Sequence, residues 1–161
     1  MKLLKFYILD FFKSYDNNIK VRVIGRTDDL PKDIYSEIKK VEEKTKNNTG
    51  LVLNIAFNYG GRDEITTATK KIAEKVKNGE LNIEDITEEL ISNNLYTAGQ
   101  PDPDLLIRTS GEERISNFLT WQISYSEFVF SDKYWPAFSN QDLLETIAIY
   151  QKRTRRFGGN K

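Results

Sequence analysis

The sequence contains no cysteine and no histidine among its 161 residues. These absences exclude disulfide bridges, thiolate nucleophiles and zinc sites built from Cys and His ligands. They also exclude mechanisms that move a proton through an imidazole, so carboxylates, hydroxyls, Lys and Arg remain for catalysis. The oxygen ligands that remain for a metal ion favour a hard cation such as Mg²⁺.

The sequence also lacks net charge, since 24 basic residues balance 24 acidic residues. No global positive field favours nucleic acid as a partner, and a site for an anion has to be a local cluster of basic groups. Apolar residues make up 39% of the chain and charged residues 30%, which is typical of a folded domain. We therefore expect one domain over residues 1–161.

Residues 1–16 do not resemble a signal peptide, because Lys5 and Asp10 interrupt the apolar run and no small-residue cleavage site follows. The run is too short to span a membrane. Its apolar side chains recur at helical spacing and predict an amphipathic helix; they are Leu4, Tyr7, Ile8, Phe11 and Phe12. Core packing is the favoured role of this helix, and membrane contact is the alternative.

Apolar runs alternate with helical patterns through the rest of the chain. The runs predict strands at residues 19–25, 51–58 and 105–107. Helices are predicted from Pro31 through Val41, over 63–77 and 84–93, and from Ser139 or Asn140 through Tyr150. The last of these has its apolar face at Leu143, Leu144, Ile147 and Tyr150. This alternation predicts an α/β fold with a mostly parallel sheet and helices on both faces.

A local cluster of basic groups follows the strand at residues 105–107. Arg108 stands where this strand ends, and ligands of open α/β sheets gather at the carboxyl ends of the strands. A charged loop leads from there to Arg114, and Ser116 is placed to cap a helix over residues 117–122. Two guanidinium groups, a hydroxyl group and a helix N-terminus together favour a phosphate or diphosphate.

The spacing of these residues alone supports an alternative to the phosphate site equally well. Arg108 and Arg114 could instead form surface ion pairs of little consequence. The acidic candidates for such pairs are Glu112, Glu113 and Glu127. Glu127 stands in an apolar and aromatic run, where a carboxylate needs a partner. The basic residues from Lys152 to Arg156 are expected to stabilise the C-terminus of the last helix and to face solvent.

Four motifs of the chain recur, in the same order, in one known family. They are LNIAFNYGGRDEI, LLIRTSGEERISNFLTWQISYSEFVF, the Trp135-Pro136 pair and the terminal RRFGG. In these motifs the chain closely resembles the cis-prenyltransferases, and among them the bacterial undecaprenyl diphosphate synthases. The resemblance implies a homodimeric, Mg²⁺-dependent enzyme. Such an enzyme adds isopentenyl diphosphate with cis geometry to an allylic diphosphate such as farnesyl diphosphate, and makes the lipid carrier for cell-wall synthesis.

The resemblance also implies roles for individual residues where positions match. The positions that hold isopentenyl diphosphate are Arg108, Arg114, Ile115 and Ser116. Glu127 matches the carboxylate that binds Mg²⁺ in the family. Arg156 and Gly158 match the C-terminal element that completes the active site across the dimer. Ile19 and Leu51 match positions at the far end of the product tunnel. A cytoplasmic location is implied, with peripheral contact to the membrane surface through the lipid product.

One departure from the family pattern is large. The chain contains no DGNGRWA-like loop, which in the family carries the catalytic Asp and grips the allylic diphosphate. We therefore expect a fold truncated to the C-terminal two thirds, with no catalytic residue of its own, and Glu113 stands where the family may place a His. Two interpretations follow. The chain is a prenyltransferase or an inactive fragment of one, or it is a non-catalytic subunit that keeps the isopentenyl diphosphate site and the dimer surface. In that role it would pair with a homologue that carries the loop.

Overall fold

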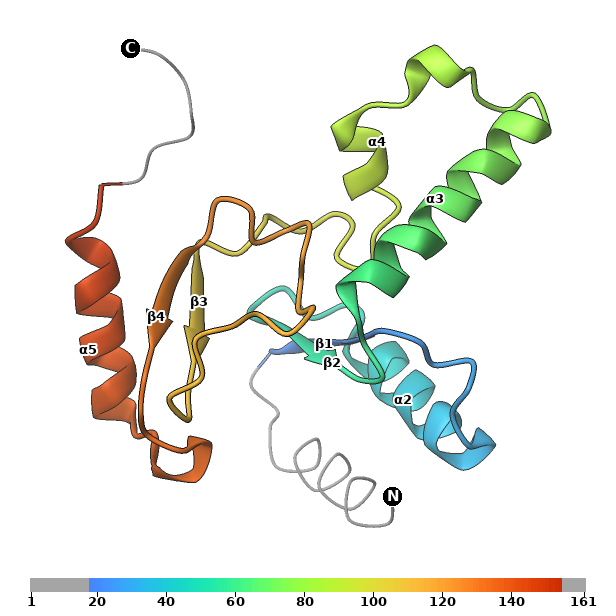
Figure 1. The fold of residues 1–161 in the computed structure, drawn as a ribbon. Coiled ribbons are helices and arrows are strands. Elements are labelled where there is room, and N and C mark those ends of the chain that lie inside the picture. The colour runs from blue at the N-terminus through green and yellow to red at the C-terminus, as the bar shows by residue number, and fades with distance from the viewer. Residues whose placement is uncertain (1–17, 155–161) are drawn as a thin grey trace. The chain divides into compact units, whose positions relative to one another are not determined.

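A computed structural model of the chain describes residues 18–154, which fall into two compact units (Figure 1). The first unit ends at Thr97 and the second begins at Ala98. The helix predicted for residues 1–16 lies outside the described residues, as do Arg156 and Gly158. One domain over residues 1–161 stays a prediction.

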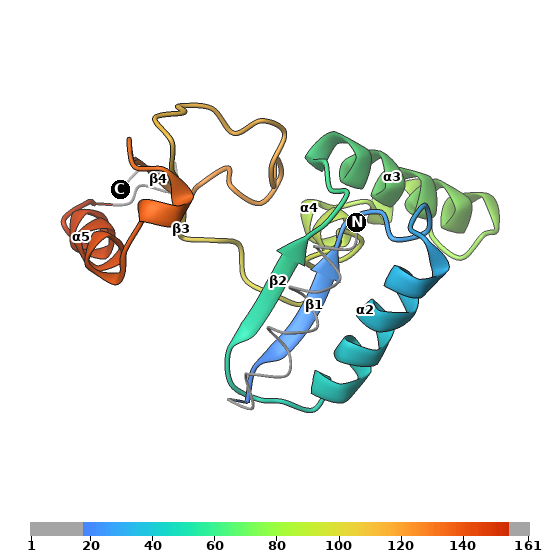
Figure 2. The same cartoon turned by 90° about the horizontal axis from the view of Figure 1, so that it is seen from below.

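The first unit is built on a pair of parallel strands. Strands β1 (Lys20–Ile24) and β2 (Val52–Ala56) pair in register from their first residues to their last. Parallel neighbours cannot be joined by a tight turn, and helix α2 (Lys32–Thr45) makes the crossover between them. The buried residues of α2 recur at spacings of four and three, and the helix packs along β1 (Figure 2); they are Ile34, Ile38 and Val41.

Helix α3 (Gly61–Lys77) follows β2 and carries a buried carboxylate, Glu64, which is 1% exposed. This side chain accepts hydrogen bonds from the Tyr59 hydroxyl group at 2.5 Å and from the backbone N–H of Tyr96 at 2.6 Å. The short elements η1 (Ile83–Asp85) and α4 (Glu88–Ser92) lie between α3 and Tyr96. Because a buried carboxylate requires donors, Glu64 ties the start of α3 to the end of the first unit.

The second unit is built on another parallel pair, β3 (Leu105–Arg108) and β4 (Glu127–Phe130). Leu105 lies opposite Glu127, and Arg108 lies opposite Phe130. The 3-10 helix η2 (Trp135–Ala137) and helix α5 (Asn140–Gln151) follow, and α5 packs against β4. A mixture of helices and parallel strands, as the sequence predicted, is therefore confirmed.

The helix predicted over residues 117–122 is wrong, and Ser116 is therefore not its cap. Residues 116–125 form a series of turns, in which Ser116, Asn117 and Leu119 have φ angles of +46°, +64° and +44°. These left-handed values are incompatible with a right-handed helix. The apolar pattern in this stretch instead buries Ile123, which is 4% exposed.

The last helix is confirmed with Ser139 as its N-cap, but its apolar face is only partly covered. Leu143 and Leu144 are 41% and 60% exposed, whereas Thr146 is buried. Thr146 is a compatible core residue because its hydroxyl group donates to the carbonyl of Asp142 in the preceding turn at 2.8 Å. None of the helices within residues 18–154 has the length and apolar character needed to cross a bilayer.

Replacing Glu64 tests the link that it makes within the first unit. We expect Glu64→Ala to lower the free energy of unfolding by about 2 to 3 kcal/mol, because two partly buried donors would lose a charged acceptor. Glu74→Ala, at an exposed position of the same helix, should change it by less than about 0.5 kcal/mol. Urea denaturation of both variants measures the difference. Equal stabilities would contradict the role given to Glu64.

Candidate functional site

Arg108 ends β3 and reaches the segment that follows the loop. Its Nη1 group donates one hydrogen bond to Ser116 Oγ at 3.1 Å and another to the backbone carbonyl of Arg114. One guanidinium group therefore holds residues 114–116 beside the end of the strand. The structure thus brings together the four predicted substrate residues, with Ile115 between the two contacts.

The intervening loop is attached to the backbone that leaves β4. Ser110 and Gly111 have φ angles of +74° and +66°, so the chain turns sharply after the strand. Their N–H groups donate to the carbonyls of Lys133 at 2.8 Å and Ser131 at 2.9 Å, and the Ser131 N–H donates to the Arg108 carbonyl at 2.8 Å. The contacts between β3 and β4 thereby continue beyond the last ladder pair and support the loop.

A hollow of about 250 Å³ lies beside this loop. Its lining combines the strand end with the returning segment: Leu106, Ile107, Arg108, Thr109, Arg114, Ile115 and Phe118. Pockets for drug-sized ligands span roughly 300 to 1,000 Å³, so this hollow suits a smaller group. The lining combines two cationic groups with apolar side chains, which matches a small anion that carries a short apolar chain.

The ion pairs considered as the alternative are present only in part. Arg114 pairs with Glu112, and both side chains are substantially exposed. Within residues 18–154, the side chain of Arg108 forms no ion pair with a carboxylate. Its side chain donates hydrogen bonds to neutral acceptors, so its positive charge remains able to attract an anion.

Glu127 does not join this cluster. It opens β4 opposite Leu105, three positions before the level of Arg108, an offset of roughly 10 Å at the rise of a strand. Its Oε2 accepts a hydrogen bond from Arg153 Nη1 at 2.8 Å, and the same group donates to the Phe128 carbonyl at 2.8 Å. The interpretation of the basic C-terminal residues was therefore incomplete, because Arg153 supplies the partner that Glu127 required.

Glu127 could provide one of the several oxygen ligands that a metal ion requires. No group of three or more Asp or Glu side chains suited to a metal ion occurs within the described part of the chain. Mg²⁺ usually takes one or two protein carboxylates and completes its coordination with water and substrate phosphates. Glu127 can supply one such oxygen, in competition with Arg153.

The two predicted tunnel residues lie at the same end of the sheet in the first unit. The Lys20 N–H donates to the Leu51 carbonyl at 2.8 Å, and the Ile19 carbonyl accepts from Asn48 Nδ2 at 2.8 Å. Leu51 is 64% exposed, so its side chain has little cover from the rest of this unit. Their roles as tunnel residues stay a prediction, as do those of Arg156 and Gly158.

Comparison with known proteins identifies relatives that match most of the chain. A family model described as putative undecaprenyl diphosphate synthase matches residues 1–158. The chain is 55% identical over 144 residues to the farnesyl-diphosphate-specific ditrans,polycis-undecaprenyl-diphosphate synthase of Micrococcus luteus. It is 55% identical over 157 residues to the geranylgeranyl-diphosphate-specific tritrans,polycis-undecaprenyl-diphosphate synthase of Methanocaldococcus jannaschii. These matches cover 89% and 96% of this chain but only 58% and 56% of the relatives.

Solved structures agree with these relatives. The chain matches lavandulyl diphosphate synthase from Lavandula x intermedia, solved in complex with dimethylallyl diphosphate, with a TM-score of 0.88 and 38% identity. That match covers 93% of this chain and 67% of the other. A probable undecaprenyl diphosphate synthase from Campylobacter jejuni matches with a TM-score of 0.86 and 34% identity, over 98% of this chain and 72% of the other.

The left-handed glycine in the loop provides a test of the site. Gly111→Ala and Gly79→Ala both place a side chain at positive φ, at +66° and +72°, and each should lose about 1 kcal/mol of stability. Only Gly111 lies in the loop beside the hollow, so only Gly111→Ala should weaken the binding of inorganic diphosphate. Calorimetry on both variants measures the affinity. Equal loss of affinity in both would show that the loop conformation is irrelevant to binding.

Proposed function

Because this chain belongs to the undecaprenyl diphosphate synthase family of the cis-prenyltransferases, we propose that its arginine-lined hollow binds isopentenyl diphosphate. The chain would thereby act in the condensation of this substrate with an allylic diphosphate, which gives a cis-polyprenyl diphosphate. One observation supports the proposal above all. Arg108 carries a charge that no carboxylate within residues 18–154 neutralises, it lines the hollow together with Arg114, and it donates hydrogen bonds to the Arg114 carbonyl and to Ser116.

Each residue of the hollow has a distinct role in this proposal. The guanidinium groups of Arg108 and Arg114 would bind the diphosphate, because charge-assisted hydrogen bonds to phosphate oxygens are stronger than neutral ones. The Ser116 hydroxyl group would donate to the same anion. Ile115 and the apolar lining at Leu106 and Phe118 would face the short hydrocarbon chain, which excludes water from the reacting carbon atoms.

Glu127 and the C-terminal residues have proposed roles outside the hollow. Glu127 would supply a carboxylate oxygen to Mg²⁺, and the ion contributes positive charge that stabilises a departing diphosphate. The offset of Glu127 along β4 is consistent with a site completed by more than one segment or chain. We propose that Arg156 and Gly158 contact the substrate of a second subunit, in a homodimer or with a homologue that carries the DGNGRW-like loop. Ile19 and Leu51 would line the product tunnel.

Binding of isopentenyl diphosphate can be measured without turnover. We expect Arg108→Ala and Arg114→Ala each to weaken binding by about 1.5 to 3 kcal/mol, roughly tenfold to 150-fold in Kd, because each removes charge-assisted hydrogen bonds. Lys71→Ala removes an exposed positive charge on α3 and should leave the affinity unchanged. Isothermal calorimetry compares the variants. Wild-type affinity in both arginine variants would show that neither guanidinium group binds the diphosphate.

Chain elongation tests the remainder of the proposal. We expect the 161 residues alone to incorporate no labelled isopentenyl diphosphate into lipid in the presence of farnesyl diphosphate and Mg²⁺. The donors of the DGNGRW-like loop are absent from these residues, and loss of even one donor to a developing anion costs about 2.7 to 4 kcal/mol. Activity should appear when a segment carrying that loop is fused or supplied by a partner, and Glu127→Ala should abolish it.

Two results would change this conclusion. Product from the 161 residues alone, lost in Glu127→Ala, would show that these residues suffice for catalysis. Binding of isopentenyl diphosphate without elongation, even after the segment is supplied, would favour a non-catalytic binding subunit.

A further inference from the structure

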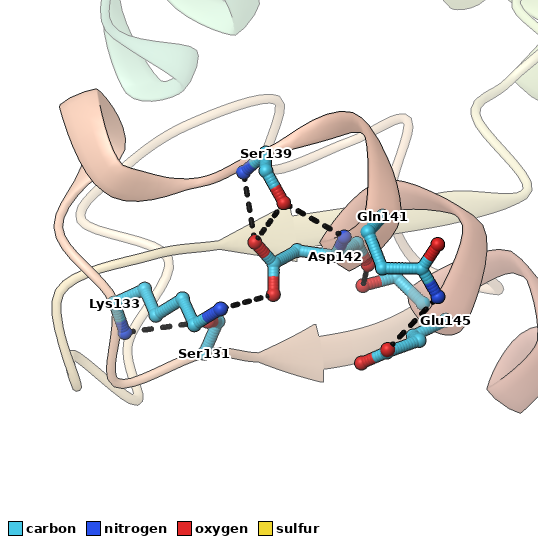
Figure 3. Close-up of polar contacts among 7 residues, drawn as sticks. Ser131, Lys133, Ser139, Gln141, Asp142 and Glu145 are labelled. Atoms are coloured by element: carbon cyan, nitrogen blue, oxygen red, sulfur yellow. Dashed lines mark hydrogen bonds and ion pairs between the residues drawn. The ribbon is translucent and has the colours of Figure 1, made fainter.

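The segment from Ser131 to Lys133 makes two kinds of contact. Its backbone carbonyls accept hydrogen bonds from the N–H groups of Gly111 and Ser110, which fixes the turn of the loop over residues 109–116, called the arginine loop below. The Lys133 ammonium group reaches in another direction and pairs with Asp142 Oδ1 at 2.5 Å (Figure 3). One residue thus connects the loop beside the hollow with the first turn of α5.

Asp142 is itself held firmly. Its Oδ2 accepts hydrogen bonds from the Ser139 N–H at 2.8 Å and the Ser139 hydroxyl group at 2.6 Å, which leaves Oδ1 for Lys133. The Asp142 side chain is only 12% exposed, against 56% for Lys133. The hydrogen bonds from Lys133 and then Ser139 hold the pKa of Asp142 well below its usual range, and the hydrogen bond to Asp142 raises the pKa of Lys133.

Helix α5 is tied to β4 at its other end as well. Arg153, just beyond the helix, donates to Glu127 Oε2 and to the Phe128 carbonyl at the start of β4. Asp142, in the first turn of α5, pairs with Lys133, which follows the end of β4. The helix therefore restrains both ends of the strand that supports the arginine loop.

We propose that Lys133 and Asp142 are positioning residues for the arginine loop, which keep Arg114 and Ser116 placed for a diphosphate before it binds. This inference rests on the proposed function of the hollow. The physical reason is preorganisation: a loop held in its bound conformation loses less conformational freedom when the ligand arrives. The Lys133 side chain does not line the hollow, so its effect would pass through the backbone contacts to Ser110 and Gly111.

A plain capping role for Asp142 is the competing explanation, and Ser139→Ala separates the two. That variant removes the hydroxyl group of the cap and should destabilise α5, since loss of a cap costs about 0.5 to 2 kcal/mol. It leaves the Lys133–Asp142 ion pair in place. Lys133→Met does the reverse, because it removes the ion pair and keeps the cap.

The experiment compares Lys133→Met, Asp142→Asn and Ser139→Ala in the full chain by three measurements: the melting temperature, amide hydrogen exchange over residues 109–116, and the Kd for inorganic diphosphate. We expect Lys133→Met and Asp142→Asn to speed exchange at Ser110 and Gly111 and to weaken binding roughly two- to fivefold, the range expected for an exposed ion pair. Ser139→Ala should lower the melting temperature while both loop measurements stay as in the wild type.

The results distinguish failure of the positioning role from failure of the proposed function. Wild-type chain that does not bind diphosphate at all would overturn the proposed function and, with it, this inference. Wild-type chain that binds, with exchange or Kd unchanged in Lys133→Met, would overturn the positioning role alone. A loss of affinity in Ser139→Ala equal to that in Lys133→Met would also overturn it, because general stability of α5 would then explain both.

Discussion

The parallel pairing of β3 with β4, continued past Arg108 by backbone hydrogen bonds to residues 131–133, is the constraint on which the candidate site depends. A parallel pair puts the carboxyl ends of both strands at one edge, so the loop after β3 and the segment after β4 must meet there. Their contacts hold Ser110 and Gly111 at left-handed φ angles, which a residue other than glycine, such as Ser110, rarely adopts. These contacts therefore also set the positions of Arg108 and Arg114 at that edge of the sheet.

Arg108 can combine its structural contacts with the proposed binding role through different atoms of one side chain. A guanidinium group has five N–H donors in a rigid plane, and the contacts with Arg114 and Ser116 use Nη1 only. The remaining donors stay available for an anion in the hollow. A lysine could not replace it, since three donors on one point charge cannot hold a loop and grip a diphosphate in a fixed geometry.

The sequence predicted the parts of this structure that depend on local pattern. The strands at residues 105–107 and 51–58 were evident from their apolar runs, and Arg108 followed from the position where such a strand ends. The expected burial of the second strand was wrong, because no residue of β2 is buried. The helix over 117–122 was wrong because left-handed angles at Ser116, Asn117 and Leu119 leave no trace in an apolar pattern. The Glu127–Arg153 pair joins residues 26 positions apart, and no local periodicity identifies such a contact.

That distant pair also bears on the proposed metal site. Arg153 neutralises the only carboxylate proposed for Mg²⁺, so a metal ion at Glu127 must displace this ion pair or share its oxygens. An ion that binds after the diphosphate has supplied oxygen ligands would need fewer oxygens from Glu127, so it would compete less with Arg153.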